Sequence, residues 1–315
     1  MKKPAKKTYR IRNWSEYNKG LVKRGSLTIW ISEDAAEGWY NQELSGGRGA
    51  SDIYSDAAIL CVLTLKEVYH QPLRQAQGLT RSILDLMGLQ QLDVPNYTTL
   101  CRRRTRLPIA LGATPRGEAI DIVVDSTGLK IYGEGEWKVR QHGPSKRRTW
   151  RKMHLGIDPA THEIVAAMVT TNDVSDGEVL KDLLDQPEDE IARVMADGAY
   201  DTRDCYDAIN DIDAWAIIPP RRGAKIWQHG NSRKERLDRD ENLCGVRKKG
   251  RAGWKRDSGY HQRSLAETGM FRFKTIFGDK LGARVFESQS AEVFIKCAAL
   301  NTMARLGLPE SRAVG

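Results

Sequence analysis

The stretch AIDIVVDSTGLKIYG, residues Ala119 to Gly133, marks the point where the chain changes from helical patterns to strand patterns. Its first half is apolar and β-branched, which is typical of a strand buried on both faces of a sheet. The apolar run ends at Asp125. A carboxylate at the end of a buried strand loses hydration, so it usually has a partner or a bound cation. We therefore expect a sheet around this strand, with Asp125 as a candidate functional residue.

The segments after this strand alternate between strand and helix patterns. Two of them, RKMHLGID (151–158) and EIVAAMVTT (163–171), predict a hairpin that turns at Asp158-Pro159. The following segments predict helix, strand, helix and strand in turn: SDGEVLKDLLDQ (175–186), RVMADGAY (193–200), TRDCYDAIND (202–211) and AWAIIPP (214–220). This order predicts a mixed α/β sheet.

The composition favours a polyanionic partner. Lysine and arginine outnumber the acids 50 to 41 over 315 residues, which gives a formal net charge of +9. Nucleic acid is such a partner, although a merely basic protein fits the charge alone equally well. No apolar run reaches the length of a membrane span, and the start shows no secretory signal pattern. The five cysteines form no C-x-x-C pair, so we expect a protein of the reducing cytoplasm.

The first part of the chain is basic and helical. Residues 1–24 hold nine Lys or Arg, and residues 52–90 show helical patterns with tight turns. The segment YTTLCRRRTRL (97–107) completes a pattern that resembles a helix-turn-helix. In that interpretation Arg102, Arg103 and Arg104 contact DNA. An ordinary helical bundle explains the same pattern at least as well.

A second basic segment, WKVRQHGPSKRRTWRK (137–152), holds seven Lys or Arg and no acid. We expect phosphate contacts from some of its basic residues, namely Lys146, Arg147, Arg148, Arg151 and Lys152. A third polar segment, at about 220–256, indicates an insertion between the last strand and a final helix. The tryptophans of these two segments either stack on a base or pack in the core.

Three acids stand out as candidate metal ligands: Asp125, Asp197 and Glu267, here called the acidic triad. Asp197 ends the strand pattern RVMA, just as Asp125 ends its own strand. Two strand-end acids can converge at one sheet edge, and a third acid from a packed helix would complete an all-oxygen site for Mg²⁺, with Mn²⁺ as a substitute. For either aspartate alone, capping of a turn is the simpler explanation.

The segment GYHQRSLAETGMFRFK (259–274) predicts a helix with two stripes. The stripe that packs on the sheet contains Ala266, Met270, Phe273 and, just beyond the segment, Phe277. A neighbouring stripe contains Tyr260, Arg263, Glu267 and Lys274. At a sheet edge this stripe would place Glu267 at a metal and the two cations at phosphate. The alternative is an exposed salt-bridged face with Arg263 and Glu267 as an i,i+4 pair.

The spacing Y-x2-R-x3-E-x6-K in this second stripe resembles the signature around the catalytic glutamate of bacterial insertion-sequence transposases. The segments DSTGLKIYGEGEW around Asp125 and ADGAYDT around Asp197 resemble the first and second aspartate motifs of the same proteins. The similarity extends from NWSEYNKGLVKRGSLTIW near the start to ALNTMARLGLP near the end. Within the IS-four superfamily, the chain looks most similar to the IS-five family.

The resemblance implies a ribonuclease-H-like catalytic domain whose acidic triad is catalytic and binds Mg²⁺. It implies that Arg263, Lys274 and Tyr260 contact DNA near the transposon end. The implied chemistry is hydrolytic nicking at that end, followed by attack of the freed 3′-OH on target DNA. The implied partners are the terminal inverted repeats, target DNA and a second copy of the chain, because two ends must be paired. Association with the nucleoid follows from the same resemblance.

These observations together predict three regions. Residues 1–115 form a basic arm and a helical DNA-binding region, residues 116–305 form the catalytic domain with its insertion, and residues 306–315 form a tail. Two other functions stay open at this point: a non-catalytic DNA-binding relic or repressor, and a metal-dependent nuclease or resolvase on the same fold.

Overall fold

The structure is a computed structural model that describes residues 8–42, 52–131, 150–228 and 237–314. The chain divides into two compact units. The larger unit spans Ile109–Ala298, and the smaller unit joins Met1–Pro108 to Ala299–Gly315. In the described ranges no helix is both long and apolar enough to cross a membrane.

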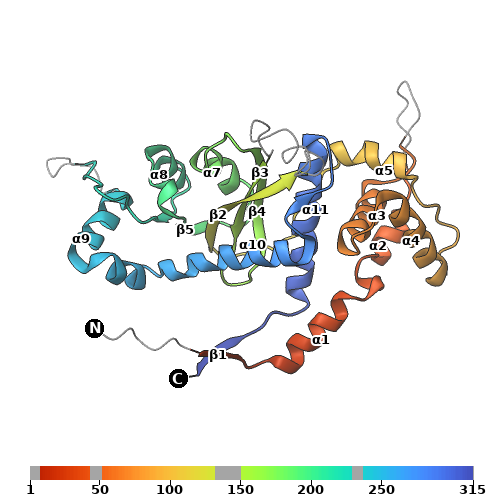
Figure 1. The fold of residues 1–315 in the computed structure, drawn as a ribbon, viewed down its shortest axis with the longest axis horizontal. Coiled ribbons are helices and arrows are strands. Elements are labelled where there is room, and N and C mark those ends of the chain that lie inside the picture. Colours follow the sequence, from red (N-terminus) through yellow and green to blue (C-terminus); the bar gives the residue numbers. More distant parts are fainter. Residues whose placement is uncertain (1–7, 43–51, 132–149, 229–236, 315) are drawn as a thin grey trace, which may run out of the picture. The chain divides into compact units, whose positions relative to one another are not determined.

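A six-stranded sheet forms the centre of the larger unit (Figure 1). Its strands are β2 (Ile120–Ile131), β3 (Trp150–Ile157), β4 (Ile164–Thr171), β5 (Ile191–Met195), β6 (Trp215–Ile217) and β7 (Lys280–Leu281). The order is β4-β3-β2-β5-β6, with β7 pairing on β2. β2, β3 and β4 are antiparallel, whereas β5, β6 and β7 continue in parallel. This confirms the predicted mixed α/β sheet and is consistent with a ribonuclease-H-like fold.

Helices cover both faces of this sheet. In the described residues, the helices of the larger unit are α7 (Leu180–Leu184), α8 (Arg203–Asn210), α9 (Asp238–Asp257), α10 (Ser264–Phe277) and the first part of α11 (Phe286–Arg305). Three short turns of 3-10 helix join them: η3 (Gly177–Val179), η4 (Gly198–Tyr200) and η5 (Tyr260–Arg263). Figure 1 shows α7 and α8 on one side of the sheet and α10 on the other.

Alternate residues of β2 pack on opposite faces of the sheet. Ile120, Ile122 and Val124 belong to the core that α7 and α8 cover. Val123 belongs to a different core with residues of β5, β6 and α10. Because side chains alternate along a strand, Asp125 and the next odd-numbered residue, Thr127, lie on the α10 face.

Small residues allow α10 to lie close to the sheet. Ala266 is fully buried, and a Cβ on Gly269 would lie 2.3 Å from Cδ1 of Ile157 on β3. The predicted apolar stripe of α10 is confirmed, because all of its members are buried: Ala266, Met270, Phe273 and Phe277. This close packing brings the neighbouring stripe to the middle of β2, at Asp125 and Thr127.

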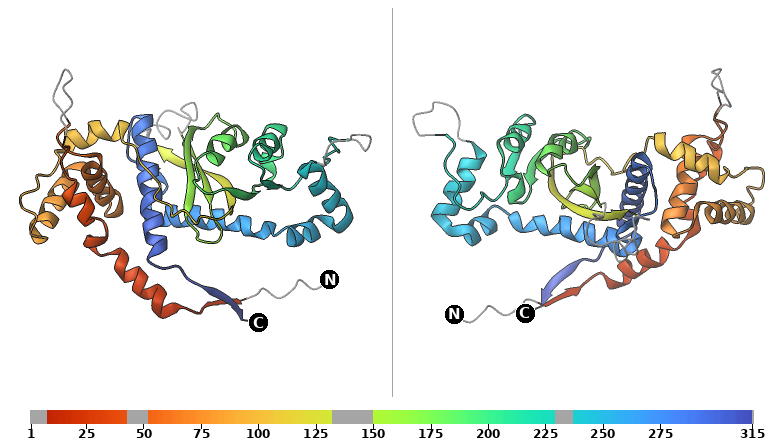
Figure 2. Two further views of the ribbon diagram at one scale, coloured as in Figure 1. Left: turned by 180° about the vertical axis from the view of Figure 1, so that it is seen from behind. Right: turned by 45° about the horizontal axis from the view of Figure 1, so that its top comes forward.

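The smaller unit is mostly helical. Its elements are β1 (Thr8–Ile11), α1 (Trp14–Arg24), η1 (Leu27–Ile29), α2 (Glu33–Glu37), α3 (Asp56–Val68), α4 (Leu73–Leu86), α5 (Tyr97–Arg103), η2 (Arg104–Arg106) and β8 (Ser311–Val314). β1 and β8 come from opposite ends of the chain and pair antiparallel (Figure 2). A short connection of the helix-turn-helix kind, residues 69–72, joins α3 to α4, whereas the longer segment 87–96 separates α4 from α5.

Two helical glycines of the smaller unit should respond in opposite ways to alanine. Gly20 of α1 is buried, and a Cβ there would lie 2.5 Å from the backbone oxygen of Leu306. Gly78 of α4 has nothing within 4 Å of such a Cβ. We expect Gly20→Ala to destabilise the packing of α1 by about 1–3 kcal/mol. We expect Gly78→Ala to stabilise α4 by about 0.5–1 kcal/mol, because alanine is the better helix former.

Amide hydrogen exchange measures both effects locally. Faster exchange in α1 of Gly20→Ala and equal or slower exchange in α4 of Gly78→Ala is the expected pair of results. Unchanged protection of α1 in Gly20→Ala would contradict the packing of this helix on Leu306.

Candidate functional site

The register between β2 and β5 places the two aspartates of the triad side by side. Val123 of β2 pairs with Met195 of β5 in a parallel ladder. Asp125 follows Val123 by two residues in the middle of β2, and Asp197 follows Met195 by two residues, just beyond the end of β5. The expectation that Asp125 ends its strand is wrong, because β2 continues to Ile131. The two acids still lie close together, because the parallel register places them at the same level of neighbouring strands.

A single guanidinium group joins all three acids. One terminal nitrogen of Arg263, Nη2, lies 2.7 Å from Oδ2 of Asp125 and 3.9 Å from Oδ2 of Asp197. The other terminal nitrogen, Nη1, donates to Oε1 of Glu267. The acidic triad thus comes from three different elements and surrounds one cation.

Each acid also has a local environment of its own. Oδ1 of Asp125 accepts the backbone N–H of Ser126 at 2.9 Å. Oδ1 of Asp197 accepts the backbone N–H of Ala199 at 2.7 Å and so caps η4. Capping therefore uses one oxygen of Asp197, while its other oxygen faces Arg263. The Glu267 side chain is 60% exposed, in contrast to 14% for Asp125.

The electrostatics at Asp125 favour a cation beside it. Burial raises the pKa of Asp125, and the neighbouring charges of Asp197 and Glu267 raise it further. Arg263 acts in the opposite direction and favours the ionised carboxylate. Three like charges at one sheet edge repel one another, so a positive group between them is required to keep them together.

The triad is chemically suited to a hard divalent cation. Its donor set consists of carboxylate oxygens only, which is the set that Mg²⁺ prefers. In the described part of the chain, no group of three or more His, Cys, Asp or Glu is spaced to hold a metal. The acids face Arg263 instead, so metal binding would require them to turn from the guanidinium toward one another.

Lys274 lies on the same face of the sheet, further along β2. Its Nζ donates to Oγ1 of Thr127 at 2.6 Å. Thr127 follows Asp125 by two residues and so shares its face of the strand. Thr127 was not among the predicted site residues. Its position two residues after Asp125 in a strand does indicate that the two side chains share one face of the sheet.

Tyr260 has a different environment from the one predicted. A single helix was expected from Gly259 onward, but Gly259 has a left-handed φ of 70° and is followed by η5 before α10 begins. Tyr260 is only 8% exposed, and its ring packs on that of Trp254. The expectation of a DNA contact from this ring is not supported by its burial.

The basic segment before β3 is described only in part. Lys146, Arg147 and Arg148 lie outside the described residues. Nε of Arg151 donates to Oε1 of Gln289 at 2.8 Å, and its guanidinium lies over the ring of Phe286. Lys152 donates to the carbonyl of Val174 and pairs with Asp176 at 3.2 Å. Both described residues therefore have protein partners.

Arg102, Arg103 and Arg104 differ sharply in exposure. Arg103 is only 4% exposed; it pairs with Asp56 at 2.5 Å and donates to the carbonyl of Tyr54 at 2.8 Å. Arg104 is also buried, whereas Arg102 is exposed. The expected DNA contact of Arg103 needs correction, because its charge holds α5 to the start of α3. The burial of Arg104 argues against a DNA contact in the same way.

The predicted insertion is anchored to the larger unit by buried polar contacts. Arg239 of α9 pairs with Asp201 at 3.2 Å, and both side chains are buried. Trp254 is buried and donates to Oδ1 of Asn242 at 3.1 Å. Trp227 packs edge-on against Tyr206. Of the two alternatives for these tryptophans, core packing is the one that their contacts support.

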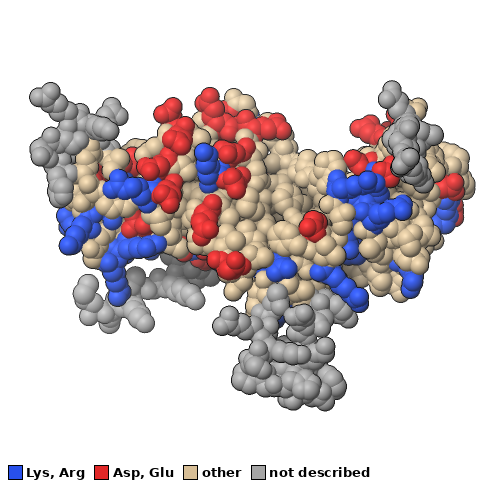
Figure 3. Space-filling model, turned by 90° about the horizontal axis from the view of Figure 1, so that it is seen from above, with Lys and Arg blue, Asp and Glu red and all other residues tan. Residues whose placement is uncertain are grey.

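The face formed by α7 and α8 is acidic. Figure 3 shows acidic side chains gathered over these two helices. The exposed acids of this region include Asp182, Asp185, Asp204, Asp207 and Asp211. Such a surface repels a phosphate backbone, so DNA is expected to approach the site from elsewhere.

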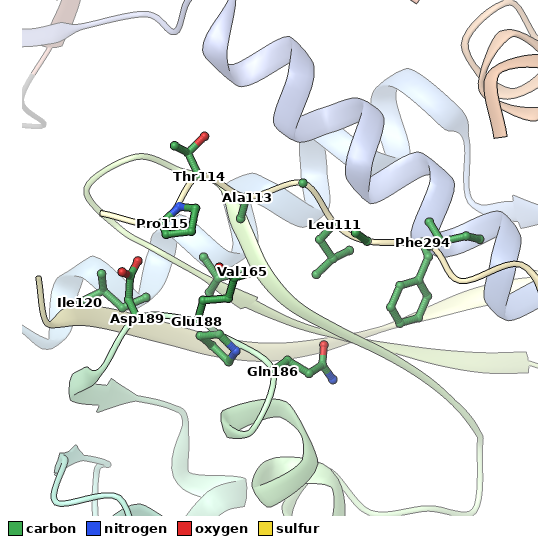
Figure 4. A pocket seen from close by; sticks show the side chains of 14 residues that line it. Leu111, Ala113, Thr114, Pro115, Ile120, Val165, Gln186, Glu188, Asp189 and Phe294 are labelled. Atoms are coloured by element: carbon green, nitrogen blue, oxygen red, sulfur yellow. The ribbon is translucent and has the colours of Figure 1, made fainter. Parts of the chain in front are cut away.

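A pocket of about 390 Å³, shown in Figure 4, includes no residue of the triad in its lining. Its lining includes residues 109–115, residues 186–189 and Phe294. The carboxylate of Asp189 accepts the backbone N–H groups of Arg116 and Gly117. This acid therefore fixes the chain near Arg116, and the pocket contains none of the residues predicted to act on DNA.

Removing the guanidinium should loosen this end of the sheet. We expect Arg263→Gln to cost about 1–3 kcal/mol, because a half-buried carboxylate loses its counter-charge. Hydrogen exchange of the β2 and α10 amides at low salt measures the loss. Lys249→Gln is the matched control, because it breaks an exposed pair with Asp257 and should cost at most about 0.5 kcal/mol. Equal protection in the two variants would show that Arg263 does not hold the triad together.

Comparison with known families agrees with this geometry. A family model described as a transposase DDE domain matches residues 116–302, more than half of the chain. A second model with the same description matches residues 22–134. No solved structure matches the chain. The chain therefore belongs to the DDE transposases, the family that its aspartate motifs and its Y-R-E-K spacing resemble.

Proposed function

We propose that this protein cleaves DNA at the terminal inverted repeats of an insertion sequence and joins the freed 3′-OH to target DNA. Membership of the DDE transposases gives the general class, an enzyme that cuts and transfers DNA. The observation that supports the specific reaction is the convergence of Asp125, Asp197 and Glu267 around one cationic group. We also propose that the chain belongs to the IS-five family of the IS-four superfamily, which its sequence resembles.

The acidic triad would hold Mg²⁺, or Mn²⁺ in its place. When bound there, such an ion supplies charge neutralisation at the phosphodiester and activation of the attacking oxygen. The carboxylates would turn away from Arg263 to do so, and Asp197 would keep its cap on η4 through Oδ1. Asp125 is the least exposed of the three acids.

Arg263 would then exchange its partners. Its guanidinium is neutralised by three carboxylates, and it becomes available once those carboxylates turn to a different cation. A guanidinium can bind a phosphate through two parallel hydrogen bonds. Arg263 would therefore orient the DNA strand at the triad, with Lys274 beside it.

The same proposal assigns the other DNA contacts and the second copy of the chain. Residues 1–115 would bind the terminal repeats, with Arg102 as an exposed candidate contact, and residues 116–305 would carry the reaction. The basic residues Lys146, Arg147 and Arg148 would contact the DNA backbone. A second copy of the chain would bring the second transposon end, and the complex would reside on the nucleoid.

Removing one carboxylate should separate chemistry from binding. We expect Glu267→Gln and Asp125→Asn to reduce joining by at least ~10²-fold, because each removes a carboxylate that would hold the divalent cation needed for the reaction. End binding should be as tight as in the wild type or tighter, because a negative charge is lost near phosphate. The assay uses purified protein, Mg²⁺ or Mn²⁺, and DNA with the pre-cut ends of the encoding element.

Asp257→Asn is the matched control, because Asp257 is an exposed acid paired with Lys249. It should join DNA like the wild type. Full activity of Glu267→Gln would contradict the proposal. Cleavage by the wild type without joining would indicate a nuclease or resolvase, and end binding without either reaction would indicate a DNA-binding relic or repressor.

A further inference from the structure

We propose that Thr127 is a positioning residue that holds the Lys274 ammonium group for a DNA phosphate without neutralising its charge. The inference rests on the proposed function, because it takes Lys274 as a contact to the transposon end. It adds the residue that directs this contact and the phosphate that receives it.

The first observation is the contact itself. Nζ of Lys274 donates to Oγ1 of Thr127 at 2.6 Å, between α10 and the centre of β2. Both side chains are partly exposed, so the ammonium remains within reach of solvent and of a ligand. Thr127 is β-branched, and its χ1 is restricted, so the strand fixes the direction of the hydroxyl.

The second observation is the contrast with three other cations around β2. Arg263 has three carboxylate partners, Lys130 pairs with Asp279 at 2.7 Å, and Lys152 pairs with Asp176 at 3.2 Å. For Lys274, the described residues provide a hydroxyl partner and no carboxylate within ion-pair distance. Its position is therefore fixed while its charge stays uncompensated.

This combination suits a phosphate contact. An ammonium group has three N–H donors, and the hydroxyl of Thr127 accepts one of them. The remaining donors can bind phosphate oxygens. A free lysine side chain loses rotamer entropy when it is held in place, and the contact with Thr127 reduces that loss on DNA binding.

The geometry also indicates which phosphate is bound. Thr127 is one same-face step beyond Asp125, roughly 6.6 Å along the strand. Lys274 would therefore contact the phosphate that flanks the one at the triad. Arg263 and Lys274 would in this way align two successive positions of one DNA strand.

Three substitutions at position 127 test this inference. Thr127→Ser keeps the hydroxyl, Thr127→Val keeps the shape and loses the hydroxyl, and Thr127→Asp adds a neutralising charge. Each is made in the full chain and in the Lys274→Ala background. The measured quantities are the dissociation constant for pre-cut end DNA, its salt dependence, and the single-turnover joining rate in Mg²⁺.

We expect Thr127→Val to weaken end binding about fivefold to tenfold, the effect of one lost hydrogen bond. Thr127→Ser should bind within about twofold of the wild type, since the hydrogen bond remains. Thr127→Asp should weaken binding further, and so should Lys274→Ala. In both variants, the slope of the log binding constant against the log salt concentration should fall in magnitude by the amount expected for about one lost phosphate contact. In the Lys274→Ala background, Thr127→Val should have no additional effect.

The double-mutant comparison distinguishes a failure of the Thr127 positioning role from a failure of the Lys274 contact with DNA. If Thr127→Val binds like the wild type, or acts equally in both backgrounds, the positioning role is wrong while the proposed function stands. If Lys274→Ala binds end DNA normally, the contact of Lys274 with DNA is wrong, and the inference fails with it. Hydrogen exchange of β2 in Thr127→Val serves as the folding control.

Discussion

The ion pairs between Arg263 and the acidic triad are the interaction on which the functional end of this molecule depends. They join β2, the end of β5 and α10 through one guanidinium group. Two features of the fold make this possible: the parallel register of β2 with β5, and the close approach of α10 through Ala266 and Gly269. Without a cation the three carboxylates would repel one another, so the same charges that suit the site to a metal also require a counter-ion when no metal is bound.

Arg263 and Lys274 have opposite electrostatic situations although they belong to one sequence signature. Arg263 is neutralised within the protein, and in the proposed mechanism its charge would become available to DNA only as the triad turns to another cation. Lys274 is held by the neutral hydroxyl of Thr127, so its charge is available at any time. The acidic face over α7 and α8 disfavours DNA on the other side of the sheet. Under the proposed function, charge distribution rather than a deep pocket would direct DNA toward the triad.

Much of this arrangement could be predicted from the sequence, because its signals are local. The apolar run before Asp125, the matching run before Asp197 and the apolar stripe of α10 each depend on neighbouring residues. The predictions that needed correction depend on contacts between distant segments. Arg103 is buried because Asp52 and Asp56 lie beside it, and Tyr260 is buried because Trp254 of α9 covers its ring. The role of Thr127 depends on its contact with Lys274 of α10. These two residues are far apart in the sequence, so no local pattern specifies their pairing.

Iron-directed cleavage of the protein backbone tests the central claim most directly, because it locates a bound divalent ion without relying on DNA chemistry. Fe²⁺ would replace Mg²⁺ at the triad, and ascorbate with peroxide would generate hydroxyl radicals that cut nearby backbone. The account predicts cuts close to Asp125, Asp197 and Glu267, suppressed by excess Mg²⁺ and absent from Asp125→Asn. Cuts that cluster elsewhere, or cuts at these positions that persist in Asp125→Asn, would contradict a metal site built from these three acids.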